Sequence, residues 1–244
     1  MSGPREWYDS LPSTQDRALE LARAGAPLGT RVIARQQSRG RGRLDHAWAS
    51  PPGSLYLSIL LPVPEQHPTW LPLALGAGLA QSFERRWHIG PRLKWPNDLL
   101  VEDASGRGRK LSGILVDDLP DSVVAVAGIG VNVRVPDGGH AVELARRTTS
   151  LAEWVDPCPS VGEVEELVAE SAVASARALI APDGIDSARR RCLERLYGAG
   201  RRATVDGRIE GTIAALGPEG ELVLDVDGER MTIRAGDLRV EGMA

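Results

Sequence analysis

The spacing of apolar residues along the chain predicts four helices. From Trp70 to Trp87 apolar side chains recur at every third or fourth position, a pattern that places them on one face of a helix. Residues 13–16, Ser-Thr-Gln-Asp, have the spacing of a capping box and so predict the start of another helix. The predicted helices are residues 14–24, 70–87, 161–180 and 185–196.

Between these helices, short apolar runs predict strands. Residues 54–61 are apolar on both faces, which is typical of a central strand. A turn at residues 103–106 separates two apolar runs and predicts a hairpin. The predicted strands of this part are residues 31–34, 54–61, 92–95, 99–101, 111–116 and 122–133.

The last part of the chain has a different pattern, with short strands separated by Asp-Gly and Gly-Pro turns. The predicted strands here are residues 202–205, 209–216, 222–226 and 230–233. So many strands in so few residues favour a small barrel. The sequence therefore predicts an α+β fold with a mixed sheet flanked by helices over residues 1–198 and a small β-barrel over residues 199–244.

Composition narrows the class of protein. With 244 residues, 42% of them hydrophobic, the chain can bury a large core without disulfides or metals. A net charge of −4 argues against general nucleic-acid binding. Two cysteines and four scattered histidines suggest neither a disulfide framework nor a zinc site. No apolar run reaches the roughly 18 residues of a membrane span, so we expect a soluble cytoplasmic protein.

Two copies of Gly-Arg-Gly-Arg, residues 40–43 and 106–109, offer backbone amides and arginines to an anion. Glycines allow successive amides to converge on a phosphate, and arginine keeps its charge. The first copy fits a phosphate-binding loop or a flexible linker. The second lies at the predicted hairpin tip, where a solvated turn accounts for it. Neither copy matches a Walker loop or a dinucleotide fingerprint.

Three further strings carry candidate chemistry. Residues 96–98, Pro-Asn-Asp, fit a turn or a nucleotide contact. Lys110, at the start of an apolar strand, fits an edge residue or an anion ligand, and Gly113 favours the close approach of a ligand. Residues 128–132 fit a bulged strand or a floor under a flat ring. Each string alone leaves both interpretations open.

Together and in order, these strings resemble the biotin protein ligase family over nearly the whole chain. The most specific parts are Lys-Trp-Pro-Asn-Asp at residues 94–98 and Lys-Leu-Ser-Gly-Ile-Leu at residues 110–115. The family joins biotin to AMP using ATP and magnesium, then passes the biotinyl group to a lysine of a carrier domain. The resemblance implies this ligase activity here, on a mixed sheet followed by an SH3-like barrel.

The resemblance also implies roles for single residues. Lys110 would bridge the biotin carboxylate and the α-phosphate, with Arg41 and Arg43 beside them. Asp98 would serve the nucleotide and, indirectly, its magnesium, and would assist the attacking lysine. The residues expected at biotin are Ser13, Thr14, Gln37, Gly40, Trp48, Gly113 and Gly128. Those expected at the nucleotide are Gly42, Asn97, Asn132 and Arg239.

The chain departs from the family pattern before Trp48. Relatives often carry a second Gly-Arg pair there, whereas this chain has Asp45 and His46. An added anion and a mostly neutral histidine make the loop less cationic. We therefore expect faster release of the bound adenylate than in arginine-rich relatives.

One alternative activity of the same fold is that of a lipoate or octanoate ligase or transferase. The 94–98 string and the polar set Ser13, Thr14 and Gln37 favour a ureido head group over a plain acyl chain. A non-catalytic sensor of biotinyl-AMP would need an output domain. Because Ser13 comes so early, no helix-turn-helix is expected, and with it no DNA binding. The expected partner is the biotin carboxyl carrier domain of a carboxylase, and the ligase itself could be a monomer or a homodimer.

Overall fold

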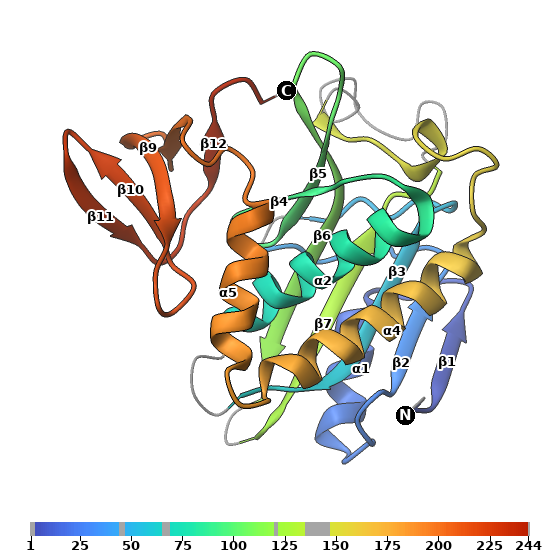
Figure 1. The fold of residues 1–244 in the computed structure, drawn as a ribbon. Helices are drawn as coiled ribbons and strands as arrows, with labels where there is room; N and C mark the ends of the chain where they lie inside the picture. Colours follow the sequence, from blue (N-terminus) through green and yellow to red (C-terminus); the bar gives the residue numbers. More distant parts are fainter. Residues whose placement is uncertain (1–2, 44–46, 65–68, 120–121, 135–146, 244) are drawn as a thin grey trace.

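A seven-stranded mixed sheet forms the centre of the computed structural model, which describes residues 3–43, 47–64, 69–119, 122–134 and 147–243 (Figure 1). Neighbouring strands are antiparallel except for the parallel pair β1 and β2. The strands, in their order across the sheet, are β1 (Arg5–Tyr8), β2 (Arg31–Ala34), β3 (Leu55–Pro62), β7 (Val124–Val131), β6 (Gly108–Asp118), β5 (Asp98–Glu102) and β4 (Arg92–Lys94).

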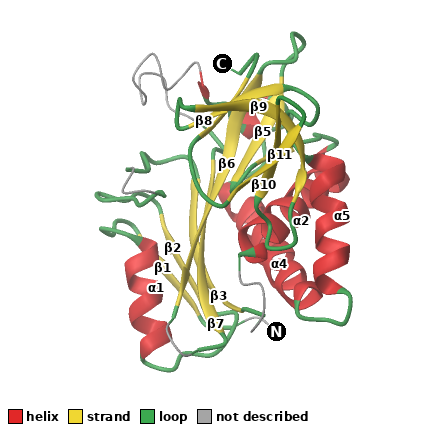
Figure 2. Ribbon diagram, turned by 90° about the vertical axis from the view of Figure 1, so that its left-hand side faces the viewer, coloured by secondary structure: helices red, strands yellow, loops and turns green. Residues whose placement is uncertain are grey.

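Helices cover both faces of this sheet (Figure 2). Of the described helices, only α1 (Thr14–Arg23) lies on one face, over a small apolar cluster that includes Ala18 and Val126. The opposite face holds the main core and carries α2 (Trp70–Trp87), α4 (Val161–Leu179) and α5 (Gly184–Arg195), and a short 3-10 helix spans Leu151–Glu153. None of the described helices is both long and apolar enough to cross a membrane.

The C-terminal part is a second, antiparallel sheet in the order β11-β10-β9-β8-β12. Its strands are β8 (Arg202–Val205), β9 (Ile209–Leu216), β10 (Leu222–Val226), β11 (Glu229–Ile233) and β12 (Leu238–Val240). The α+β class and a separate small β structure at the C-terminus are thus confirmed. The domain limits at residues 198 and 199 stay a prediction, because one apolar cluster includes residues of both sheets.

The predicted helices agree with the structure to within one residue at each end. The capping box of α1 forms only in part. The Ser13 hydroxyl accepts a hydrogen bond from the Asp16 amide at 3.4 Å, whereas the Asp16 carboxylate pairs with Arg41 instead. Two strands were missed, β1 and β12, and both are short edge strands rich in charged residues for their length.

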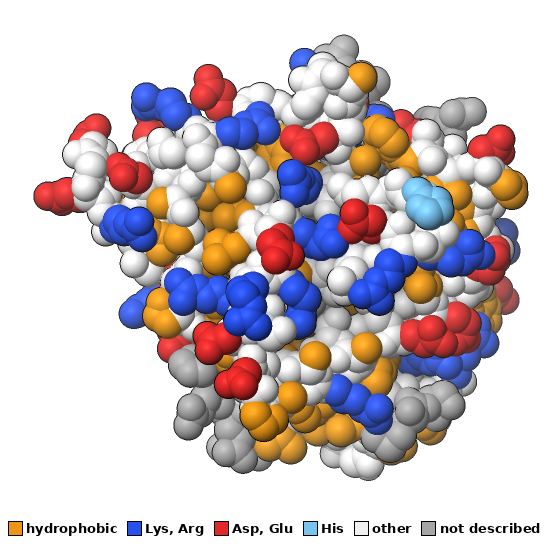
Figure 3. Space-filling model, in the orientation of Figure 1, with side chains coloured by type: hydrophobic (Ala, Val, Ile, Leu, Met, Phe, Trp, Pro, Cys, Tyr) orange, Lys and Arg blue, Asp and Glu red, His pale blue; other side chains and the backbone are white. Residues whose placement is uncertain are grey.

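Two buried indoles tie the second sheet to the first part of the chain. Trp70 Nε1 donates to the carbonyl of Pro218 at 2.7 Å, and Trp95 Nε1 donates to that of Gly220 at 2.9 Å. The surface over α2, α4 and α5 carries basic and acidic side chains interspersed, as Figure 3 shows. The two indole hydrogen bonds and the shared apolar cluster therefore attach the second sheet to the first part of the chain.

The Trp70 hydrogen bond gives a test of this attachment. Trp70→Phe keeps the ring but leaves the Pro218 carbonyl without its donor, so we expect the free energy of unfolding to fall by about 1–3 kcal/mol. Chemical denaturation measures this change. Trp7→Phe is the control, because Trp7 is 46% exposed at the sheet edge, and it should change stability by less than about 0.5 kcal/mol.

Candidate functional site

A cavity of about 300 Å³ lies on the face of the large sheet that carries α1. The 40–43 segment and the 94–98 turn border it, and Gly236 to Leu238 of the second sheet complete the wall. Most of the residues predicted from the sequence line this cavity: Ser13, Thr14, Gln37, Arg41, Gly42, Arg43, Trp48, Asn97, Asp98, Lys110, Gly113, Gly128 and Asn132. Gly40 and Arg239 do not.

The floor of the cavity is a row of residues in register across four strands. Asp98 of β5 pairs with Gly113 of β6, which pairs with Gly130 of β7, which pairs with Tyr56 of β3. Paired residues on neighbouring strands share a face of the sheet. The row therefore has a carboxylate at one end, a phenol at the other and two positions without side chains between them.

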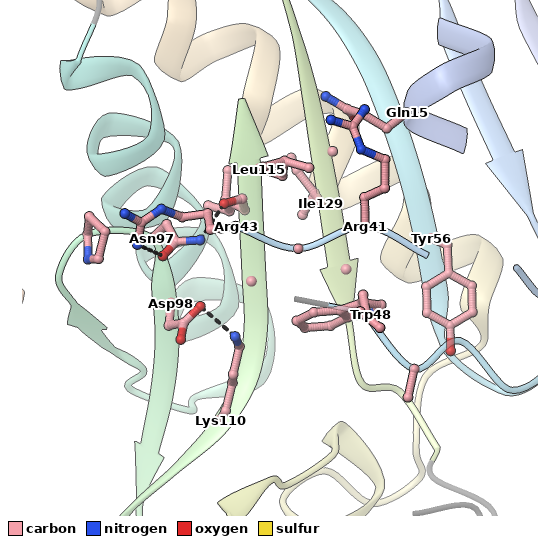
Figure 4. Close-up of a pocket in the computed structure, with 18 of the residues that line it drawn as sticks. Gln15, Arg41, Arg43, Trp48, Tyr56, Asn97, Asp98, Lys110, Leu115 and Ile129 are labelled. Atoms are coloured by element: carbon pink, nitrogen blue, oxygen red, sulfur yellow. Dashed lines mark hydrogen bonds and ion pairs between the residues drawn. The ribbon is translucent and has the colours of Figure 1, made fainter. Parts of the chain in front are cut away.

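A β-bulge brings Lys110 onto the same face. Leu99 pairs with Ser112 and Leu100 pairs with Lys110, so Leu111 is an extra residue on β6. The extra residue reverses the alternation of side chains along the strand. Lys110 Nζ consequently reaches Asp98 Oδ1 at 2.7 Å (Figure 4).

The indole of Trp48 lies across the two glycines. A Cβ atom at Gly113 or Gly130 would come within 2.8 Å or 2.7 Å of the Trp48 ring. Lys110 Nζ lies 4.8 Å from the centroid of the same ring, within the range of a cation–π interaction. Gly113 lines the cavity, and the Trp48 indole that packs against it forms a wall of the same cavity.

The backbone of Gly40 explains why it does not line the cavity. Its carbonyl accepts a hydrogen bond from the Trp48 amide at 2.9 Å. A side chain at this position would collide with the Trp48 carbonyl and the Ser50 hydroxyl. Gly40 thus holds the indole in place and is not in contact with the space it encloses.

Buried polar side chains form one end of the cavity. Gln37 Oε1 accepts from the Thr14 amide at 2.8 Å, and Ser58 Oγ lies 2.9 Å from Thr14 Oγ1 and 3.0 Å from Gln15 Oε1. Gln15 and Ser58 are 3% and 0% exposed. Gly128 leaves room for Gln15, whose Oε1 would lie 2.6 Å from a Cβ there. This end offers both hydrogen-bond donors and acceptors.

Cationic side chains gather at the opposite end. Lys94 Nζ lies 3.8 Å from Asp237 Oδ1 of the second sheet. Burial lowers the pKa of Lys94, while Asp98 and Asp237 oppose that change. Burial also lowers the pKa of Arg43, again opposed by Asp98 and Asp237. Arginine keeps its proton through such a change, so this end can attract an anion.

The two arginines of the 40–43 segment extend in different directions, Arg41 toward Gln15 and Arg43 toward Asn97 (Figure 4). Arg43 Nη1 donates to Asn97 Oδ1 at 3.4 Å, at the cationic end. Arg41 Nη1 lies 2.9 Å from Asp16 Oδ1 and 3.1 Å from Asp117 Oδ2, at the polar end. The structure therefore places Arg43, and not Arg41, beside Asp98 and Lys110.

Two expected nucleotide contacts have other partners. Asn132 donates its amide to the carbonyls of Lys110 and Thr149, at 3.2 and 3.0 Å. Arg239 is 69% exposed, and its Nε lies 3.7 Å from Asp237 Oδ2. From this part of the second sheet, Asp237 rather than Arg239 faces the cavity. Asp45 and His46 lie outside the described residues.

The polar cavity residues that sequence reasoning missed include Gln15, Ser58, Tyr56 and Asp237. Ser58 had a signal, because it is a polar residue inside the apolar run 54–61. Gln15 also had a signal, because it directly follows the polar residues Ser13 and Thr14, which were predicted to contact the ligand. The described residues contain no cluster of three or more metal-ligating side chains.

Comparisons with known proteins agree on one family. The sequence model of the biotin/lipoate A/B protein ligase family matches residues 7–133. The biotin--[acetyl-CoA-carboxylase] ligase of Mycobacterium tuberculosis is 30% identical over 243 residues, covering 93% of this chain and 85% of that protein. The bifunctional ligase/repressor BirA of Bacillus subtilis is 36% identical over 155 residues, so the match spans 46%, or about half, of that relative's length.

A solved structure gives the same result. The biotin protein ligase from Aquifex aeolicus in complex with biotin and ATP superposes with a TM-score of 0.82 at 26% identity. The match covers 98% of each chain. The likeness thus includes both the large sheet and the C-terminal sheet.

The glycine row gives a test of the site geometry. Gly130→Ala would force the Trp48 ring away from the sheet, so we expect it to lower the free energy of unfolding by about 1–3 kcal/mol and to change indole fluorescence. Gly162→Ala is the control, since nothing lies near a Cβ there. In helix α4 it should be neutral or stabilising by up to about 1 kcal/mol. An unchanged stability of Gly130→Ala would contradict the placement of Trp48.

Proposed function

The chain belongs to the biotin/lipoate A/B protein ligase family, and on that premise we propose that it is an ATP-dependent biotin protein ligase. It forms biotinyl-5′-AMP from biotin and ATP and then transfers the biotinyl group to a lysine of a biotin carrier domain. The observation that carries the proposal is one cavity with a polar end rich in hydroxyl and amide groups, an aromatic wall and a cationic end. These three environments match a ureido ring, an acyl chain and a phosphate.

The polar end supports biotin over lipoate as the substrate. A ureido group has one carbonyl acceptor and two N–H donors, and the Thr14, Gln37 and Ser58 side chains offer partners of both kinds. The dithiolane ring of lipoate lacks these donors and its sulfur atoms accept hydrogen bonds only weakly. A lipoate ring would thus leave buried polar groups unpaired, which costs binding energy.

In the first step a carboxylate oxygen of biotin attacks the α-phosphorus of ATP, and pyrophosphate leaves. The carboxylate is ionised at neutral pH, so the step needs no base, only two anions held together. We assign Lys110 as the cation that contacts both the biotin carboxylate and the α-phosphate. Asp98 and the Trp48 ring fix its ammonium group in the cavity. Arg43 adds a second positive charge from the 40–43 segment.

In the second step the carrier lysine attacks the acyl carbon of the adenylate, and AMP leaves. The attacking amine has to lose a proton. Asp98, whose side chain is 14% exposed in its ion pair with Lys110, is the carboxylate that we propose as the acceptor of that proton.

Magnesium fits the site only together with the nucleotide. Mg²⁺ is commonly held by substrate phosphates with one or two carboxylates and several waters, and Asp98 and Asp237 are the carboxylates that line the cavity. Both are paired with lysines. The ion would neutralise phosphate charge, with Asp98 acting on it indirectly. We place the reaction in the cytoplasm, and the carrier domain of a biotin-dependent carboxylase is the proposed protein partner.

The test of this function is a mass measurement. The protein is incubated with ATP, magnesium and a biotin carrier domain, with biotin or lipoate offered separately, and the carrier is weighed. We expect the mass of one biotinyl group in the biotin sample alone. A gain with lipoate alone would replace the proposal by a lipoate ligase.

Lys110→Ala tests the central assignment. Loss of one cationic contact to the reacting anions should lower the rate of adenylate formation about a hundredfold, or about 3 kcal/mol. Pyrophosphate release measures this rate. Arg109→Ala is the matched control, because Arg109 is the next residue on the same strand but pairs with Glu153 at 2.7 Å. Its rate should stay within about twofold of the wild type.

A further inference from the structure

The 40–43 segment, which we call the strap, crosses the cavity and is fixed near both ends (Figure 4). At one end Arg43 donates to Asn97 at 3.4 Å. At the other end Arg41 is shared by Asp16 of α1 and Asp117 of β6, at 2.9 and 3.1 Å. The strap is therefore tied to both sides of the cavity by its two arginines.

Asp117 has a second partner, which leads into the cavity. Gln15 Nε2 donates to Asp117 Oδ2 at 3.3 Å and to the carbonyl of Val126 at 2.9 Å. The other amide atom of Gln15, Oε1, lies 3.0 Å from Ser58 Oγ, which contacts Thr14. A continuous chain of polar contacts thus connects the polar end of the cavity to the strap.

We propose that Asp117 is a positioning residue that holds the strap across the cavity through Arg41 and is itself oriented by Gln15. This inference rests on the proposed function, in which the polar end takes the ureido ring. Asp16, in the first turn of α1, forms the second ion pair with Arg41. Neither carboxylate touches the reacting atoms.

The same geometry changes the role of Arg41. With two carboxylates within 3.1 Å of Nη1, its charge is already compensated, and an incoming phosphate would have to compete with both. Arg43 has no carboxylate at that distance among the described ion pairs. Arg41 is consequently an anchor of the strap, and its loss should affect ligand retention rather than the chemical step.

The experiment compares the release of a non-hydrolysable biotinyl-AMP analogue from the wild type, Asp117→Asn, Arg41→Gln and the double variant. We expect each single variant to release the analogue about threefold to fivefold faster, the size of a half-exposed ion pair. The double variant should release it no faster than the single ones. For Asp117→Asn, kcat at saturating substrates should stay within about twofold of the wild type, while KM for biotin rises.

Glu6→Gln is the matched control, because Glu6 forms an ion pair of similar exposure with Arg17 of the same helix, at 3.0 Å, and does not contact the strap. It should leave the release rate unchanged. Salt should accelerate release from the wild type more than from Asp117→Asn, since one of the two ion pairs of Arg41 is already absent in that variant. A release rate for Asp117→Asn equal to that of the wild type would overturn the proposal.

A large loss of kcat in Arg41→Gln alone, on the order of a hundredfold, would also overturn it, because Arg41 would then act on the phosphate. A substrate-free readout separates this inference from the proposed function. Trypsin should cut the strap of ligand-free Asp117→Asn after Arg41 faster than that of Glu6→Gln or the wild type. If the wild type neither binds the analogue nor biotinylates a carrier, the proposed function fails, and equal cleavage of all three proteins refutes the strap anchor on its own.

Discussion

One extra residue in strand β6 determines which side chains face the cavity. In a regular strand Lys110 and Gly113, three positions apart, would lie on opposite faces of the sheet. The bulge at Leu111 removes this conflict and pairs Lys110 with Asp98 of the neighbouring strand. The cation, its carboxylate and the glycine row that seats Trp48 then share one face. The cavity would lose its cationic centre without the bulge.

The strap divides its two arginines between different tasks, although the sequence presents them as equivalent. Residues two apart in an extended segment point to the same side, so the spacing of Arg41 and Arg43 alone would let both face one anion. Their observed partners nevertheless lie in different parts of the cavity wall. Arg41 meets Asp16 and Asp117, and Arg43 meets Asn97. Arg41 thus attaches the strap at one end of the cavity, and Arg43 supplies positive charge at the other end.

Local patterns predicted the elements well and the contacts of the site less well. Helix α2 has the predicted limits because its apolar spacing is sustained over 18 residues. Lys110 and Asp98 were predicted as site residues because they belong to the sequence motifs at residues 110–115 and 94–98. The bulge, the seat of Trp48 and the pairing of Arg41 with Asp117 depend on strand register and on residues 76 positions apart, 41 and 117. No local pattern carries that information.

The 94–98 string connects the two sheets at the site. Trp95 donates to the Gly220 carbonyl and Lys94 lies near Asp237, both in loops next to strands of the second sheet, whereas Asn97 and Asp98 face the cavity. Asn97 in turn donates to the carbonyl of Ile114 at 2.6 Å, which fixes the turn against β6. A displacement of the second sheet would therefore move the carboxylate that pairs with Lys110. The C-terminal sheet accordingly acts on the site through the position of this turn as well as through the wall it supplies.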